Sequence, residues 1–266
     1  MRLAQSNRLP IYQVDAFTDR VFAGNPAAVI PLEAWLPDAM LQAIAAENNL
    51  PATAFFRYEG ESCAIRWFTP TVELPLCGHG TLAAAHVILN LLDTRASRIV
   101  FDTKAGALTV SRHGSGLALD LPLNRAAPCA LPPGLAEALG KLPVAVLTTR
   151  NYLAVFDCAS DVAGMTPDFA ALAQLHCIGV IITAPGRDGV HCVSRYFAPA
   201  LGVDEDAVTG SAHCTIVPYW SGRLGKSTIV GRQISRRGGA LTGEVCGDRV
   251  ILAGEARLYL EGTITV

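Results

Sequence analysis

The chain of 266 residues contains one pattern of motifs twice, and this repeat constrains the fold more than any other feature. Each of three short segments in the first half has a counterpart about 130 residues later, in the same order. Three ordered matches at nearly one offset predict two similar halves. The matched segments are RWFTP (66–70) with RYFAP (195–199), PD (37–38) with PD (167–168), and ELPLCGH (73–79) with EDAVTGS (205–211).

The predicted elements follow the same order in both halves. The first half is expected to contain strands near 10–17, 27–32, 53–58 and 62–69, helices near 38–48 and 79–92, and three short strands up to about 121. The second half is expected to contain strands near 143–149, 152–157, 177–184 and 190–198, helices near 167–175 and 210–221, and further strands up to Val266. A proline-rich connector at 121–133 separates them, which predicts domains over 1–122 and 123–266.

Composition excludes several classes of protein. Apolar residues make up 51% and charged residues 17%, so the chain is not disordered and has few charged side chains for its surface. A subunit interface and the many alanines explain this composition equally well. A net charge of −2 with scattered cations argues against a nucleic-acid partner. The 8 cysteines include no CxxC pair, which argues against a metal site, and no apolar run predicts a leader or a membrane span. We therefore expect a cytoplasmic protein with reduced thiols.

The loop CGHG (77–80) has two possible interpretations. The residues from Gly78 to Ala83 fit the GxGxxA pattern of dinucleotide-binding loops. That pattern requires a buried parallel strand directly before it, whereas Pro70 and Pro75 lie in the preceding segment. GKS (225–227) also lacks the first glycine of a phosphate-binding loop. The second interpretation is therefore favoured: these glycines begin a helix whose free N–H groups bind an anion.

Gly210 begins the second predicted copy of this loop and helix. Glycine at a helix start lets a ligand approach the backbone amides closely. Two such helix starts at one cleft between the halves would hold a carboxylate or stabilise an enolate. No metal or organic cofactor is needed for such a site, and its expected ligand is a small anionic metabolite.

Six segments carry a family resemblance: VDAFT (14–18), FAGNPAAV (22–29), AAENN (45–49), FTP (68–70), ELPLCGH (73–79) and DEDAVTGSAH (204–213). They resemble the PhzF-like phenazine biosynthesis family, which shares its fold with diaminopimelate epimerase. The resemblance implies an α+β fold of two pseudo-symmetric domains, each a strongly curved mixed sheet wrapped around a central helix. It also implies a cofactor-free isomerase, commonly a homodimer, with its site between the domains.

Matched motif by motif, the family's acid/base glutamate corresponds to Glu47 and its histidine to His79. Its aspartate and serine correspond to Asp206 and Ser211. In the epimerase relatives two cysteines flank the substrate carbon; Cys77 matches the first, whereas Thr209 stands at the second position. Substrate-binding residues are expected at both helix starts, namely Gly78, Gly80, Thr81, Gly210, Ser211 and Ala212.

Each candidate has an expected physical setting. The chemistry of Glu47 requires a partly desolvated carboxyl with a raised pKa, at the margin of the buried stripe of its helix. His79 at a helix start is expected to be neutral, because the helix dipole disfavours a cation there. Cys77 beside the same amides is expected to have a lowered pKa. Ser211 is expected to cap the second helix, and Asp206 to orient the substrate or pair with His79.

These expectations favour an isomerase that removes and returns a proton next to a carbonyl or a conjugated acid. Glu47 carries the proton, with His79 and Asp206 assisting. Three alternatives remain open at this point. Cys77 can serve an amino-acid epimerase or racemase with a non-thiol partner, or it can be the nucleophile of a cysteine hydrolase. Against the hydrolase, residues as close in sequence as Cys77 and His79 are not expected to meet in the required geometry, and the sequence offers no evident third group to orient the histidine. The chain can also be a non-catalytic anion-binding protein.

Overall fold

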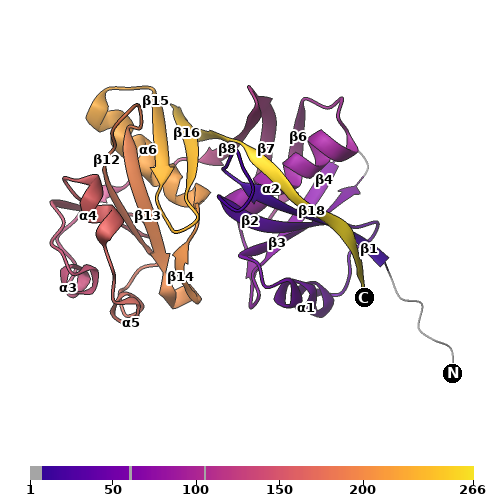
Figure 1. Cartoon of the computed structure of the whole chain (residues 1–266), viewed down its shortest axis with the longest axis horizontal. Coiled ribbons are helices and arrows are strands. Elements are labelled where there is room, and N and C mark those ends of the chain that lie inside the picture. Colours follow the sequence, from indigo (N-terminus) through magenta and orange to yellow (C-terminus); the bar gives the residue numbers. More distant parts are fainter. Residues whose placement is uncertain (1–7, 60–61, 105) are drawn as a thin grey trace. The chain divides into compact units, whose positions relative to one another are not determined.

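The computed structural model describes residues 8–59, 62–104 and 106–266, and the chain forms two compact units. The first unit runs to Leu119 and also contains Glu255–Val266, whereas the second unit spans Asp120–Gly254. The predicted second domain, 123–266, therefore includes a C-terminal segment, Glu255–Val266, that belongs to the first unit in the structure. The last strand, β18 (Ala256–Thr265), pairs antiparallel with β1 (Arg8–Ala16) and so belongs to the first unit. This return of the chain is visible in Figure 1, where β18 lies beside β1.

The first unit contains β1, β18 and most of the N-terminal strands. These are β2 (Asn25–Pro31), β3 (Ala52–Glu59), β4 (Ser62–Phe68), β5 (Glu73–Leu74), β6 (Arg98–Thr103), β7 (Gly106–His113) and β8 (Gly116–Pro122), the last of which crosses the boundary between the units. Its helices are α1 (Asp38–Asn48) and α2 (Gly78–Val87), and a π-helical turn, Ile88–Leu92, continues α2. The expected helix over 79–92 is thus present, with a wider last turn.

The second unit has the same order of elements, but the helices that precede its central helix are shorter. Its strands are β9 (Ala127–Pro128), β10 (Ala145–Thr148), β11 (Tyr152–Val155), β12 (Val180–Pro185), β13 (Cys192–Ala198), β14 (Val203–Asp206), β15 (Thr228–Gln233), β16 (Gly239–Cys246) and β17 (Arg249–Gly254). Its helices are α3 (Leu135–Leu139), α4 (Ala159–Gly164), α5 (Phe169–Leu172) and α6 (Gly210–Leu224), with a 3₁₀ turn at Pro199–Leu201. The helix predicted near 167–175 is only one turn, α5.

The strand directions of the first unit recur in the second unit in the same order. In the first unit β1–β2 is antiparallel, β2–β3 parallel, β3–β4 antiparallel and β4–β6 parallel. In the second unit β10–β11, β11–β12, β12–β13 and β13–β15 show the same alternation. The central helix of each unit lies between corresponding strands, α2 after β5 and α6 after β14. The two halves are therefore copies of one mixed-sheet unit.

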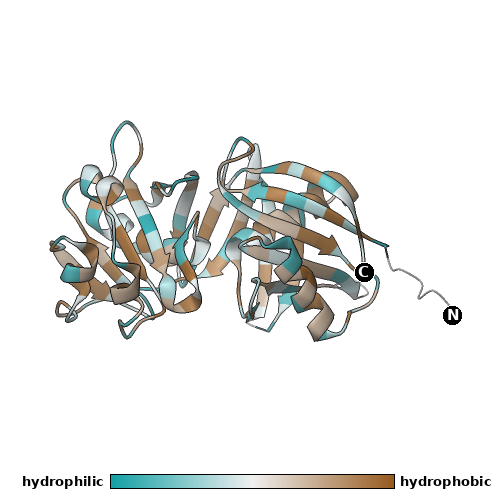
Figure 2. Cartoon of the chain, turned by 60° about the horizontal axis from the view of Figure 1, so that its bottom comes forward, coloured by the Kyte–Doolittle hydropathy of each residue, from teal (hydrophilic) through white to brown (hydrophobic). Residues whose placement is uncertain are grey.

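The apolar cores form where the buried faces of the strands pack against a helix. In β4, Cys63, Ile65 and Trp67 point to the buried face, whereas Arg66 lies on the other face and is half-buried. Figure 2 shows this pattern as alternating brown and teal or white bands along the longer strands. Helix α2 is buried except at His86 and packs against β1, β2, β3, β7 and β18. The predicted fold class, a curved mixed sheet around a central helix, is confirmed.

Helix α1 covers another part of the first sheet. Its buried residues, Leu41, Ile44 and Ala45, pack with Ile30 and Phe55 of the strands, as its apolar spacing predicts. The C-cap residue after the helix is Asn49, which adopts a left-handed conformation with φ 49°. None of the described helices is long and apolar enough to cross a membrane.

Candidate active site

The loop between β5 and α2 places Cys77 outside the helix but against its first turn. Cys77 occupies the N-cap position with φ −141° and ψ 102°, and its side chain makes no capping hydrogen bond. Its carbonyl accepts from both the amide (3.0 Å) and the hydroxyl (2.6 Å) of Thr81. An added Cβ at Gly80 would lie 2.9 Å from Trp67 Cδ1 and 3.1 Å from Cys77 Sγ. Glycine is therefore needed at position 80 for the loop and β4 to approach each other.

Cys77 and His79 meet in this loop, contrary to the expectation drawn from their closeness in sequence. The thiol Sγ lies 3.5 Å from His79 Nδ1 and 3.9 Å from Nε2, and both side chains are buried. Residues two positions apart within a helix point in different directions. Here the extended backbone of Cys77 turns its side chain back over the first helical turn, which permits the contact. The pair can exchange a proton between sulfur and imidazole nitrogen.

Glu47 lies in the last turn of α1, beside the buried stripe, as the sequence predicts. Its side chain is exposed, so the partial desolvation expected for its chemistry is not observed. Its neighbour Asn48 fixes the helix end by donating from Nδ2 to Thr53 Oγ1 at 3.2 Å. The carboxylate of Glu47 is thus held on an anchored helix end and is open to a ligand.

The corresponding loop of the second unit is organised around Asp206 and Thr209. Thr209, not Ser211, is the N-cap of α6, and the prediction that Ser211 caps this helix is wrong. Thr209 occupies the cap position, but its hydroxyl donates to Asp206 Oδ2 at 2.6 Å and accepts no hydrogen bond from the first turn of the helix. Ser211 lies in the first turn, where its side chain is exposed, while Ala212 is buried.

Gln233 supports this loop and was not identified from the sequence. Its side chain, 1% exposed, accepts the Thr209 amide on Oε1 at 2.9 Å and donates from Nε2 to the Asp206 carbonyl at 2.7 Å. A glutamine in a strand is unremarkable in sequence, because its role depends on the tertiary pairing of β13 with β15.

His213 is a structural residue of α6. Its Nδ1 donates to the Thr209 carbonyl at 2.8 Å, and its Nε2 has no partner among the described residues. Burial lowers the pKa of His213 to about 4, although the bond to Thr209 opposes this shift. The imidazole is therefore neutral at pH 7, with its proton on Nδ1.

Acid should destabilise the fold over a pH range that depends in part on the titration of His213. Its folded pKa lies below the ordinary value of 6.5, so the unfolded chain binds a proton first. This contribution to stability is complete above about pH 6.5 and is lost as the pH falls towards 4, by at most about 3 kcal/mol. Urea unfolding at pH 7 and at pH 4.5 should show a smaller fall for His213→Gln than for the unsubstituted chain. An equal fall in both proteins would contradict this assignment; His86, with a pKa also lowered to about 4, accounts for a further part of the loss.

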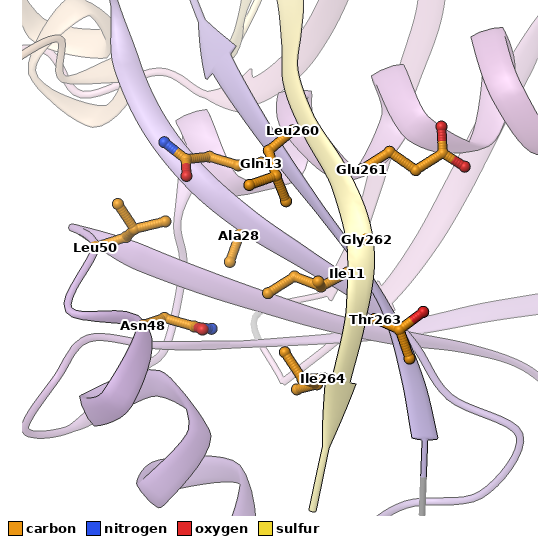
Figure 3. Close-up of a pocket in the computed structure, with 10 residues that line it drawn as sticks. All are labelled: Ile11, Gln13, Ala28, Asn48, Leu50, Leu260, Glu261, Gly262, Thr263 and Ile264. Atoms are coloured by element: carbon orange, nitrogen blue, oxygen red, sulfur yellow. The ribbon is translucent and has the colours of Figure 1, made fainter.

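A pocket of about 380 Å³ lies in the first unit between β1, β18 and the end of α1. Figure 3 shows Asn48 and Leu50 at one side of it and Ile11, Ala28 and Ile264 along the strands. The predicted catalytic residues are not among those drawn there. Within the described ranges no three His, Cys, Asp or Glu side chains are grouped so as to hold a metal ion.

Comparison with known proteins extends over nearly the whole chain. The family model described as phenazine biosynthesis-like protein (PhzC-PhzF) matches residues 14–262. An uncharacterized isomerase of Pseudomonas aeruginosa is 50% identical over 256 residues, which cover 96% of this chain and 98% of that protein. Another uncharacterized isomerase, from Halalkalibacterium halodurans, is 41% identical over 96% of this chain and 98% of its own length. Relatives this similar indicate an isomerase.

Solved structures give the same result for the fold. A PhzF-family crystal structure from Enterococcus faecalis superposes with a TM-score of 0.94 at 44% identity, covering 98% of this chain and 100% of the other. A hydroxyproline epimerase from Agrobacterium vitis, at 10% identity and a TM-score of 0.63 over 100% of this chain and 94% of the other, shares the fold alone. The chain therefore belongs to the phenazine biosynthesis-like (PhzC-PhzF) family.

Proposed function

We propose that this chain is a cofactor-independent isomerase of a small, carboxylate-bearing metabolite. In the reaction a proton is removed from a carbon next to a carbonyl or conjugated acid and is returned to the substrate. One observation carries the proposal: both units start their central helix at a glycine, and the cap residue, Cys77 or Thr209, offers no side-chain acceptor to the first turn. Each helix end therefore suits an anionic oxygen.

The proposed acid/base group is Glu47. Its carboxylate takes the proton from the substrate carbon, and the electron pair left behind spreads onto the neighbouring carbonyl as an enolate. The protonated carboxyl then donates to another carbon, or to the other face of the same carbon, so no net charge or atom is gained. The exposed position of Glu47 gives a substrate access to it.

The helix amides supply the charge stabilisation that a metal or organic cofactor supplies in other enzymes. We assign anion binding to Gly78, Gly80 and Gly210, with the neighbouring Ser211 as a side-chain donor. Ala212 contributes through its backbone, because its side chain is buried. Thr81 supports the site indirectly, because both its amide and its hydroxyl donate to the Cys77 carbonyl. His79 and Asp206 assist by hydrogen bonding and by orienting the substrate.

The contact between Cys77 and His79 favours a second candidate, an epimerase in which the thiol is the base. An imidazole 3.5 Å from sulfur can accept the thiol proton and leave a reactive thiolate. The same contact meets the first requirement of a cysteine hydrolase, a thiol within reach of an imidazole.

Proton exchange in D₂O tests the proposal directly. Each member of a panel of small carboxylic, keto and amino acids is incubated with the protein, and deuterium incorporation is followed by NMR. The proposal expects exchange at a carbon next to a carbonyl or a conjugated acid in at least one compound. Release of an acid or amine fragment without exchange would favour the hydrolase. Saturable binding without any exchange would favour an anion-binding protein and would contradict the proposed function.

A further inference from the structure

The guanidinium of Arg66 joins two parts of the first unit that carry candidate catalytic residues. Its Nε and Nη2 donate to the two carboxylate oxygens of Glu73 at 2.8 and 2.9 Å, a bidentate ion pair. Its Nη1 donates to Asp38 Oδ1 at 2.8 Å. Asp38 is the first residue of α1, the helix that carries Glu47, and Glu73 opens β5, four residues before Cys77.

The surroundings of this ion pair restrict its movement. The guanidinium lies 5.1 Å from the ring centre of Phe68 and 5.6 Å from that of Trp35. Lys104 Nζ donates to both Glu73 oxygens at 3.0 Å. The hydrogen bonds from Arg66 lower the pKa of Glu73 to about 2 against the effect of burial, so the carboxylate stays charged at any pH used for an assay.

The second unit contains the same arrangement at the corresponding place in the repeat. Arg195 pairs with Glu205 through Nε (2.7 Å) and Nη2 (2.9 Å), and its guanidinium lies 5.0 Å from the Phe197 ring centre. Its remaining nitrogen, Nη1, donates to the carbonyls of Val162 (3.2 Å) and Met165 (2.6 Å) at the end of α4. In both units the arginine thus joins a peripheral helix, α1 or α4, to the segment that precedes the central helix, α2 or α6. The two units differ in the acceptor: Arg66 contacts the helix through the carboxylate of Asp38, whereas Arg195 contacts it through backbone carbonyls.

We propose that Arg66 is a positioning residue of the candidate active site. It holds the Glu47 helix and the loop of Cys77 and His79 in one fixed arrangement, while touching neither the substrate nor the reacting atoms. A planar, bidentate guanidinium fixes both distance and orientation, whereas a lysine at the same place fixes only a charge. The inference rests on the proposed function for its catalytic meaning, but its structural claim is measurable without a substrate.

The test is the rate at which iodoacetamide alkylates Cys77, read by mass spectrometry of the peptide that contains it. Cys77 is 5% exposed, so alkylation requires local opening of its loop. Arg66→Met should raise this rate about tenfold or more, and Arg66→Lys should recover part of the protection. Arg195→Met is the matched control: it removes the same kind of ion pair from the other unit and should leave the Cys77 rate within about twofold of the unsubstituted chain.

Glu73→Gln removes the charge from the same pair while keeping the shape of the side chain, and it replaces Arg66→Met if that variant does not fold. It should also raise the Cys77 rate. Protection of Cys77 unchanged in both variants would overturn the proposal, and so would an equal increase in Arg195→Met, which would show general loosening of the fold. Because iodoacetamide alone is the probe, these results hold whether or not Glu47→Gln abolishes proton exchange. Failure of the positioning proposal is therefore distinguishable from failure of the proposed function.

Discussion

Replacing Glu47 by glutamine is expected to lower the rate of proton exchange into the substrate by about a hundredfold to ten-thousandfold. The amide keeps the size of the side chain but cannot accept the substrate proton. Its exposed position on α1 means that the change should leave the free energy of unfolding nearly unaltered. Exchange rates by NMR, with urea unfolding of the same samples, measure both quantities.

Two further variants define the effect of the glutamate. Glu47→Asp keeps the carboxylate but withdraws it by one methylene, so an intermediate loss is expected. Glu33→Gln removes another exposed carboxylate of the first unit and serves as the control for net charge. Exchange at the unsubstituted rate in Glu47→Gln would remove Glu47 from the mechanism.

Gly24→Ala should destabilise the first unit by about 3 kcal/mol or more. Gly24 has φ +64°, and an added Cβ would lie 2.2 Å from the Ala16 carbonyl oxygen and 2.7 Å from Thr18 Cγ2. The backbone oxygen cannot move away without breaking the turn between β1 and β2. That turn also contains Phe22, at φ 67°, whose amide donates to the buried carboxylate of Asp15 at 2.8 Å.

Gly114→Ala is the matched control for this prediction. Gly114 also has a positive φ, 55°, but an added Cβ meets nothing within 4 Å. It should therefore lose only about 1 kcal/mol, the backbone contribution that the two variants share. Urea or thermal unfolding measures both, and equal losses would show that the close approach at Gly24 has no energetic role.

The repeat made two similar α+β halves predictable from the sequence, because local signals agreed in both. The curved sheet around a central helix was implied by the family resemblance. Helix α1 begins at Asp38 and ends at Asn48 as its apolar spacing predicts, and α2 and α6 start at the glycines that mark the repeat. The destination of the C-terminal strand was not predictable in this way. Pairing of β18 with β1 joins residues at opposite ends of the chain, and no local pattern encodes such a contact.

The site was predictable in its residue types but less so in its contacts. Motif matching identified Cys77 and His79, yet their contact depends on the extended backbone at position 77, which a helix rule does not describe. The capping prediction for Ser211 failed because the helix begins at Gly210, two residues earlier than a cap at Ser211 requires. The Arg66–Glu73 and Arg195–Glu205 pairs were detectable, since all four residues lie in the repeated segments at matching positions.

The most direct test of the central claim compares two variants in one deuterium-exchange experiment, with the compound that exchanges fastest. The carboxylate mechanism predicts that Glu47→Gln loses exchange by a hundredfold or more, while Cys77→Ser loses no more than about tenfold, through its contact with His79. The opposite order, with exchange retained in Glu47→Gln and abolished in Cys77→Ser, would contradict the account and identify the thiol as the base.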